Sequence, residues 1–409
     1  MELKTRYQYT YFIYPYIVKE NRYNRYILSL LKNSKCELKI FQKDKDFDVY
    51  KYFSPKIREF MFGSFDYNKT KLTNLKELPI ETQAGILSKN SCTIFEYNIK
   101  KDIQGKTENR DGIFFKINKM QLICFNTGIC FLLIKTNVEN TNLFSDILNF
   151  NYKFRDINQE FTKFNNYDRI RIQTDSFADV RTFREFIRDL TGSNIEAVKL
   201  NLNIERFLTY SYTCIDKEYW NSEEDFQKLK KEYIKYINIL PSDNLVEYEE
   251  EEKIISTFKY SKIGITKQGI TLFASSKEIN NYTILPDEFE KQYLYNYILA
   301  LYMKIYMEKL NFEFKQGHKL KNIRRKFIEF TKNLWIQEIT SNDDGTVFYH
   351  KLKQILELEK IYYNLKNKYD VLYKELNIEK SRKSTIIIAL ILIASLIFNI
   401  MNFVVLINR

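Results

Sequence analysis

The chain has 409 residues, and its 64 Lys and Arg against 52 Asp and Glu give a net charge of +12. This length can bury a sizeable core in two or three units. The positive charge favours anionic lipid or nucleic acid as a partner, although a dispersed surplus also keeps an aromatic-rich chain soluble. Two His, ten Gly and five scattered Cys argue against a disulfide framework, a zinc site and a glycine-rich phosphate loop.

Motifs that carry catalysis are missing from the sequence: it has no nucleophile elbow, no carboxylate pair beside a base and no metal-ligand spacing. We therefore expect no catalytic residue, no metal site, no cofactor and no enzymatic activity. The cysteines form no C-x-x-C pair and are expected to be small buried hydrophobes in a reducing compartment. They are Cys36, Cys92, Cys124, Cys130 and Cys214.

The N-terminal part is rich in β-forming residues. Tyr7 to Val18 predicts a first strand, which Pro15 places near a sheet edge, and Arg25 to Leu31 predicts a short helix. Four further runs predict an antiparallel meander with turns near Asn118-Lys119 and at Thr127-Gly128. These runs are Cys92 to Ile99, Gly112 to Ile117, Gln121 to Asn126 and Ile129 to Thr136.

The region from Asn142 to Pro286 mixes helical and strand patterns. Helices are expected at Asn142 to Phe154, Asp175 to Leu190 and Ser222 to Ile237, a strand at Ile204 to Tyr212, and a hairpin within Ile254 to Ala274. The acidic run Glu247 to Glu252 is typical of a solvated loop or helix start, and a cation site is the alternative. Residues 1–285 are thus predicted to form an α+β cytoplasmic domain with an antiparallel sheet.

Long helices are expected from Pro286 onward. Glu288 to Leu310 is aromatic on nearly all sides and must be packed between other elements. Leu320 to Ile339 has an apolar stripe and a basic face, and the cations that could bind a nucleotide, DNA or a lipid headgroup are Lys321, Arg324, Arg325 and Lys326. A solvated face is the alternative for these cations.

The last sixty residues contain neither Gly nor Pro after the turn Ser341 to Gly345, and they predict one long helix from Thr346 to Arg409. Its apolar residues step by three or four, with one stammer between Ile355 and Leu358, and predict a coiled-coil seam between copies of the chain. The proposed seam is Leu352, Ile355, Tyr362, Leu365, Tyr369, Leu372 and Leu376. Residues 286–383 are therefore interpreted as a helical stalk.

The end of this helix predicts a membrane span. Thr385 to Ile407 has no charged residue and would reach roughly 35 Å, enough to cross the hydrocarbon layer, so residues 384–407 are assigned as one transmembrane helix. A buried core helix is the alternative. Lys380, Arg382 and Lys383 before the span, against Arg409 after it, predict a cytoplasmic N-terminus.

Three polar residues within the span, Ser395, Asn399 and Asn402, share one helix face. An amide in hydrocarbon needs a partner or water, so this face should meet other copies of the helix or an aqueous pore. The stripe by itself favours a pore lining and interhelical hydrogen bonding equally.

From Pro286 onward the chain resembles the CorA family of divalent-cation channels. The likeness is carried by the seam Tyr369-Asp370-Val371-Leu372-Tyr373, by the passage from Ser381 to Thr385, and by Ile400-Met401-Asn402-Phe403, which is similar to that family's Gly-Met-Asn signature. Ile400 stands where the family has Gly, and one span stands where the family has two. These differences favour the CorA-like membrane effectors of bacterial antiviral defence over a transporter.

The resemblance implies a homo-oligomer, a pentamer or tetramer, in the bacterial cell membrane, whose channel is gated by its cytoplasmic domain. It also implies control by a nucleotide or oligonucleotide and a partner enzyme that makes this signal. A non-conducting, tail-anchored scaffold or receptor is the alternative, and a Mg²⁺ transporter is a second one.

Overall fold

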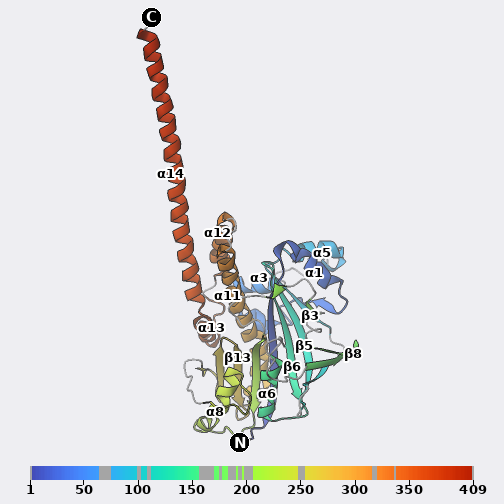
Figure 1. Ribbon diagram of the computed structural model, residues 1–409. Coiled ribbons are helices and arrows are strands. Elements are labelled where there is room, and N and C mark those ends of the chain that lie inside the picture. Colours follow the sequence, from blue (N-terminus) through green and yellow to red (C-terminus); the bar gives the residue numbers. More distant parts are fainter. Residues whose placement is uncertain are drawn as a thin grey trace.

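The computed structural model describes residues 2–63, 75–98, 103–107, 112–155, 170–174, 177–182, 190–191, 196–197, 206–246, 254–315, 320–335 and 338–407. A mixed sheet with helices on both faces forms the body, and one helix extends far beyond it (Figure 1). The predicted acidic run Glu247 to Glu252 lies outside the described residues.

The sheet runs in the order β11-β12-β13-β10-β1-β6-β5-β4-β7-β8, with β2 and β9 beside it and β3 paired to β5. Its strands are β1 (Thr5–Ile17), β2 (Cys36–Leu38), β3 (Cys92–Tyr97), β4 (Ile103–Thr107), β5 (Phe114–Phe125), β6 (Ile129–Glu139), β7 (Ile170–Thr174), β8 (Phe177–Thr182), β9 (Glu196–Ala197), β10 (Leu208–Ile215), β11 (Ile254–Ile255), β12 (Ser261–Thr266) and β13 (Gly269–Ser275).

Strand β1 is central, so the prediction of an edge strand is wrong. It pairs antiparallel with β6 along one side and with β10 along the other. Pro15 is tolerated because β10 pairs β1 only as far as Ile13 and β9 resumes at Tyr16. On that side no described strand pairs with Pro15, so its missing N–H breaks no ladder there.

The sheet is mixed rather than antiparallel, which corrects the predicted fold class. Strands β10 and β13 are parallel, with Thr209 opposite Gly269 and Ile215 opposite Ser275. Parallel neighbours need a crossover connection, and here it contains helix α8 (Asp225–Asn238) and the strand β12. The predicted hairpin within Ile254 to Ala274 is confirmed as β12 and β13.

Strand β5 is one long strand where the sequence suggested two. The predicted turn at Asn118-Lys119 is a bulge instead, because the pairing register with β6 shifts between Ile117 and Lys119. The Asn118 amide donates to Asn137 Oδ1 at 2.9 Å across the bulge. The turn at Thr127-Gly128 is confirmed, and Gly128 has φ +84°, a conformation that glycine adopts without strain.

The sequence predicts a helix from Asp175 to Leu190, but most of the residues that the structure describes in this range form strand β8. Phe177–Thr182 pairs antiparallel with β7. The prediction of a helix was wrong because a short run with β-branched residues fits the helical period of 3.6 residues as well as the strand period of 2. Pairing with the neighbouring strand β7 favours the strand. The predicted helices at Arg25 to Leu31, Asn142 to Phe154 and Ser222 to Ile237 are confirmed as α1 (Tyr23–Lys32), α6 (Phe144–Phe154) and α8.

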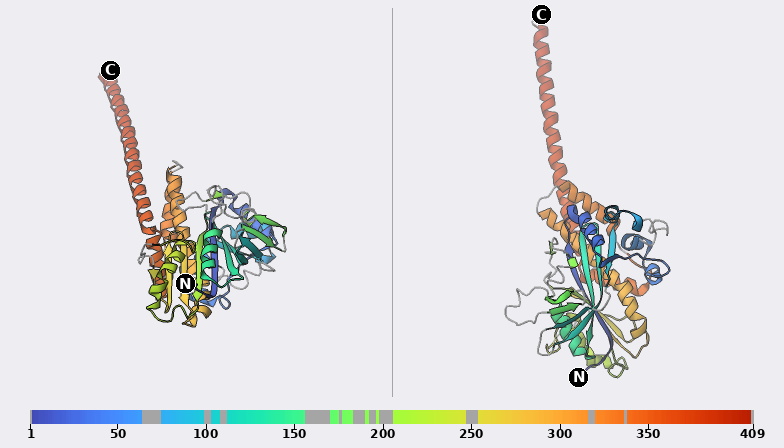
Figure 2. Two further views of the ribbon diagram at one scale, coloured as in Figure 1. Left: turned by 60° about the horizontal axis from the view of Figure 1, so that its bottom comes forward. Right: turned by 90° about the vertical axis from the view of Figure 1, so that its right-hand side faces the viewer.

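Two apolar cores lie on the two faces of the sheet, and β1 shows the alternation. Tyr9, Tyr11 and Ile13 face one core, whereas Phe12 and Tyr16 face the other. The first core also holds α2 (Phe47–Tyr52), α3 (Pro55–Phe62) and the C-terminal helices, and the second holds α1, α5 (Ile80–Leu87), α6 and α8. Figure 2 shows the strands between these helices.

The described part of the chain from Asn280 onward is helical. Its elements are α9 (Asn280–Thr283), α10 (Leu285–Glu288), the π-helix η5 (Phe289–Tyr293), α11 (Leu294–Lys315), α12 (Leu320–Glu329), the π-helix η6 (Phe330–Leu334), α13 (Asp343–Ile355) and α14 (Leu358–Ile407), and a 3-10 turn, η1 (Glu20–Arg22), lies near the N-terminus. As predicted, α11 is buried around nearly its whole circumference along its first four turns. Pro286, the predicted domain boundary, lies in α10, and the helices after it share a core with the sheet.

The final helix is broken, contrary to the single rod expected from Thr346. Helix α13 ends at Ile355, and Glu357 adopts a left-handed φ of 56° before α14 starts. The break coincides with the stammer in the apolar pattern. Asn342 caps α13 by accepting a hydrogen bond from the Gly345 N–H at 2.8 Å, so the predicted turn is the start of a helix.

Candidate functional site

Helix α14 consists of a segment held by the body and a segment that leaves it. Leu358, Leu365 and Tyr369 are buried, whereas beyond Tyr369 every residue whose side chain is described is exposed. Ser381–Asn402, within the exposed segment, is the one helix among the described residues that is long and apolar enough to cross a membrane. None of that stretch is buried against the body, which excludes the alternative of a core helix within one chain.

Aromatic stacking fixes the held segment. Tyr362 stacks on Trp335, with centroids 4.2 Å apart, and Tyr369 stacks on Phe327 at 4.6 Å. Phe314 of α11 meets Tyr369 edge-on at 5.6 Å. Such pairs contribute about 1 kcal/mol each beyond their buried area, so α14 leaves the body in a defined direction.

The residues of the predicted coiled-coil seam, up to and including Tyr369, pack against the body of their own chain. Leu352, Tyr362, Leu365 and Tyr369 are buried in the first core, and Ile355 packs against it half-buried. Leu372 and Leu376 follow on α14, but their side chains lie outside the described ones. The apolar period therefore reports packing against the chain's own α11 and α12, and contact between copies along the seam stays a prediction.

The polar stripe lies on the exposed segment. Ser395, Asn399 and Asn402 are all exposed, at spacings of four and three on a continuous helix. At the start of the apolar stretch the Thr385 hydroxyl donates to the Ser381 carbonyl at 2.9 Å, so its polar group is satisfied within the helix. A carboxamide has too many donors and acceptors to be satisfied in that way, so the two Asn retain unmet hydrogen-bonding capacity.

The basic face of α12 divides into two sets. Lys326 is engaged within the body, because its Nζ lies 3.0 Å from Glu20 and 3.3 Å from Glu313. Burial lowers the pKa of Lys326, but these hydrogen bonds and charges outweigh it and raise the pKa. Arg324 and Arg325 instead face solvent. The backbone of Lys321 is helical, and its side chain lies outside the described ones.

The outer arginines have weak partners. The Arg324 guanidinium lies 4.1 Å from the ring centroid of Tyr373 on α14, a cation–π contact. Arg325 Nε lies 3.9 Å from Glu329, and both side chains are largely exposed, a pairing that contributes little in water. Their charge is thus available to a further anion.

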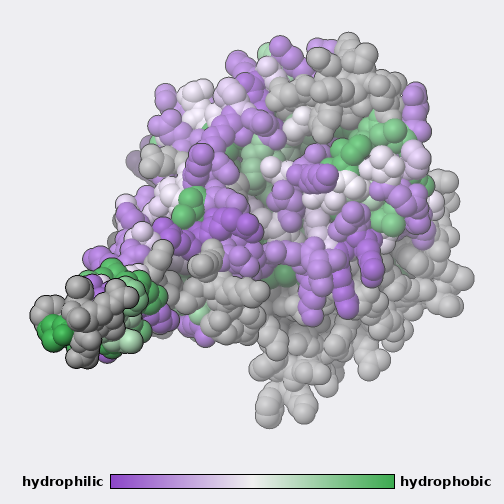
Figure 3. Space-filling model, turned by 90° about the horizontal axis from the view of Figure 1, so that it is seen from above, coloured by the Kyte–Doolittle hydropathy of each residue, from purple (hydrophilic) through white to green (hydrophobic). Residues whose placement is uncertain are grey.

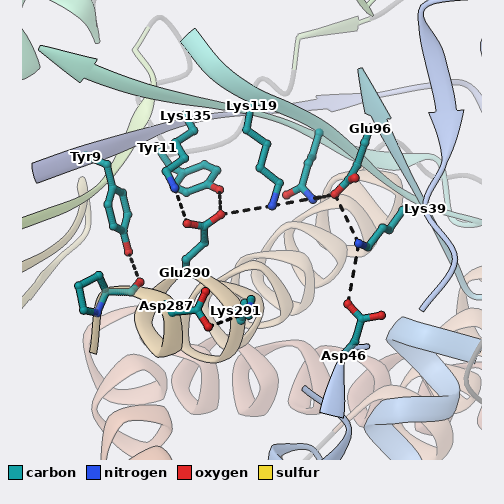
Figure 4. Close-up of polar contacts among 12 residues, drawn as sticks. Tyr9, Tyr11, Lys39, Asp46, Glu96, Lys119, Lys135, Asp287, Glu290 and Lys291 are labelled. Atoms are coloured by element: carbon teal, nitrogen blue, oxygen red, sulfur yellow. Dashed lines mark hydrogen bonds and ion pairs between the residues drawn. The ribbon is translucent and has the colours of Figure 1, made fainter. Parts of the chain in front are cut away.

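An ion network that sequence reasoning missed joins the helices to the sheet (Figure 4). Glu290 of η5 pairs with Lys135 of β6 and with Lys119, at 3.2 Å, on the β5 bulge, and it accepts a 2.7 Å hydrogen bond from the Tyr11 hydroxyl. Burial alone raises the pKa of Glu290, but the two Lys and the hydrogen bonds lower it to about 2. No signal in the sequence brings these side chains together, since they come from four separate elements.

The network continues along the sheet. Lys119 lies 3.9 Å from Glu96, Lys39 lies 4.0 Å from Glu96, and Lys39 lies 3.8 Å from Asp46. Three cations and three carboxylates alternate, so the charge balances and this row needs no further ion. We interpret it as a structural clamp that sets the position of η5 and, through α11, of α14.

A hollow of about 500 Å³ lies between α3 and β3. Its lining includes Phe41, Met61, Leu87 and Cys92 with Lys39 and Glu59. Burial raises the pKa of the Cys92 thiol well above its usual value, so this sulfur is a poor nucleophile at neutral pH. All five cysteines are free and buried, as predicted, and among the described residues no group of His, Cys, Asp and Glu could hold a metal ion.

Comparison of the chain with protein-family models, with curated proteins and with solved structures gives no match. Function is therefore inferred from the chain's own residues.

Proposed function

We propose that the chain is a single-pass membrane protein whose copies assemble through the exposed part of α14 into a conduit gated by the cytoplasmic body. The observation that carries this proposal is the continuity of α14. One unbroken helix joins residues clamped by Trp335 and Phe327 to a wholly exposed apolar stretch. A displacement of the body is therefore passed to the span along a rigid rod.

The polar stripe favours a conduit over a plain anchor. A lone helix gains nothing from Asn399 and Asn402, because each unsatisfied amide costs several kcal/mol in hydrocarbon. Rotational symmetry converts the stripe into a polar ring, in which water or neighbouring amides satisfy these groups. With Ser395 one turn before Asn399, a tetramer or pentamer would present successive polar rings along its axis.

The proposed role is that of a membrane-permeabilising effector in bacterial defence. The likeness of Ile400-Met401-Asn402-Phe403 to the CorA signature supports a channel, and the Ile in place of Gly favours a loosely selective conduit over a Mg²⁺ transporter. A signal-producing enzyme encoded nearby is the expected partner. Expression in a strain deficient in Mg²⁺ transport is expected to give no rescue.

Ion flux from liposomes tests the conduit. Three preparations of the full chain are reconstituted: the wild type, the double variant Asn399→Leu with Asn402→Leu, and a control variant, Ile393→Leu with Ile397→Leu. The control introduces two Leu at apolar positions of the span and keeps both Asn. Flux through the wild type and the control, and loss of flux in the Asn variant at equal incorporation, is the expected result.

Two outcomes contradict the proposal. If the Asn variant conducts as the wild type does, the stripe does not line the path. If no preparation conducts and a polyleucine span in place of residues 384–407 preserves the cellular effect of the protein, the chain is a tail-anchored scaffold or receptor.

A further inference from the structure

The hairpin formed by α11 and α12 points in the same direction as α14. In Figures 1 and 2 its tip is the part of the body that reaches furthest toward the C-terminal end of α14. The contact between Arg324 of α12 and Tyr373 of α14 places this tip beside Tyr373 along the axis of α14. We call Phe312, Lys315, Asn322, Arg324 and Arg325 the hairpin tip.

The hairpin tip combines cations with an exposed aromatic ring. Arg325 is 72% exposed, and Lys315 and Arg324 are exposed as well. Phe312 is 55% exposed, and it lies in the last turn of α11, beyond the four turns that are buried. Figure 3 looks along α14 onto this end of the molecule, where most of the coloured side chains around the helix are hydrophilic.

The spacing between the tip and the span is short. Twelve residues separate Tyr373 from Thr385, which corresponds to about 18 Å of helix. The headgroup zone takes up roughly 6 Å of this, and the first turn of α12 projects roughly 6 Å beyond Arg324. The remaining gap is about 6 Å from the first residue of α12 and about 12 Å from Arg324, which compares with a Debye length of about 8 Å.

We propose that the hairpin tip binds the anionic phospholipid headgroups of the membrane that α14 enters. This inference rests on insertion of α14, but not on conduction. Stacking uses the face of the Arg324 guanidinium, whereas its N–H donors lie at the edge, where they can meet phosphate oxygens. Phe312 adds an apolar contact of the kind that interfacial segments use.

The placement favours a bilayer over a soluble nucleotide. The cations of the tip lie on the outer surface of two helices, and the hollow described above lies elsewhere, between α3 and β3. A flat, polyanionic surface can contact such a convex edge, and the covalent link through α14 keeps that surface near the tip at all times. Docking would fix the angle between α14 and the bilayer, so lipid charge would act on the proposed gate.

The experiment uses the full chain in nanodiscs of phosphatidylcholine alone or of phosphatidylcholine with phosphatidylglycerol. The native cysteines are buried, so Asn322→Cys provides a single reactive thiol on the tip for an environment-sensitive fluorophore. We expect blue-shifted emission and reduced quenching by acrylamide only in the anionic nanodiscs.

Charge reversal then tests whether Arg324 and Arg325 cause the shift in emission. Each basic side chain near an anionic surface changes docking about fivefold, so Arg324→Glu with Arg325→Glu should weaken it by about thirtyfold or more and abolish the shift. The matched control, Lys217→Glu with Lys277→Glu, makes the same change of charge at exposed positions near the N-terminal end of β1. It should leave the shift intact.

Other results overturn the inference. Protection that is equal in both lipids, or that survives charge reversal on the tip, would show that anionic lipid is not bound there. If a single-stranded oligonucleotide binds the wild type in neutral nanodiscs and the tip variant loses that binding, while anionic lipid has no effect, the tip serves a soluble ligand. Failure of the chain to enter any nanodisc would instead refute the membrane assignment on which the proposed function depends.

Discussion

Glu290 joins the C-terminal helices to the sheet through Tyr11, Lys119 and Lys135. We expect Glu290→Gln to lower the free energy of unfolding at pH 7 by about 3 kcal/mol, because the largely buried Lys135 and the half-buried Lys119 lose their shared counter-charge. Urea unfolding of the full chain in detergent, followed by fluorescence of Trp220 and Trp335, measures this. Glu81→Gln, at an exposed pair with Lys32, is the control and should leave the midpoint unchanged.

The same carboxylate predicts a pH dependence. Its pKa is lowered in the folded state from 4.5 to about 2, so its contribution to stability is complete above pH 4.5 and is lost as the pH falls through about 2. The difference between wild type and Glu290→Gln should therefore be constant from pH 7 to pH 5 and fall by about half near pH 3. A difference that stays constant down to pH 2.5 would show that the charge of Glu290 is not stabilising.

At the level of elements, the break between α13 and α14 distinguishes two helices from the single continuous helix that the sequence predicts. Glu357 has a left-handed φ, which costs a non-glycine residue about 1 kcal/mol. Glu357→Gly should therefore raise the free energy of unfolding by up to about 1 kcal/mol, since its exposed pairs with Lys267 and Lys360 add little.

In a continuous helix the same substitution would lower stability by about 1 kcal/mol, so the sign of the change decides. Lys366→Gly, at an exposed position inside α14, is the matched control and should destabilise. Equal destabilisation by both substitutions would mean that α13 and α14 form one rod.

For the whole molecule, orientation in the membrane is the decisive prediction. Lys277→Cys is exposed near the end of β13, on the body, whereas the native thiols are buried. A membrane-impermeant maleimide should label this variant only after cells are opened, because the Lys and Arg that precede the span favour a cytoplasmic body. Labelling of intact cells would place the body outside and would exclude control by a cytoplasmic signal.

The apolar period of the last helix shows how far sequence reasoning reaches. Spacing by three and four marked the buried face of α13 and α14 correctly at Leu352, Tyr362, Leu365 and Tyr369. It did not identify what that face meets, because the period of a helix is the same whether its partner is another copy or, as here, the chain's own Phe327 and Trp335.

The sequence by itself determined the features that depend on neighbouring residues: most of the helices, the β-rich runs, the glycine turn at Gly128 and an uncharged stretch of the length a membrane requires. Only the tertiary structure decided that β1 is central, that β10 and β13 run parallel, and that Glu290 meets Lys119 and Lys135. Local patterns record the period and the burial of a segment, whereas the strand order and these ion pairs depend on residues that are about 60 to about 200 positions apart. The proposed site needs both, since α14 supplies the apolar stretch and its packing against α11 and α12 sets the direction in which it leaves the body.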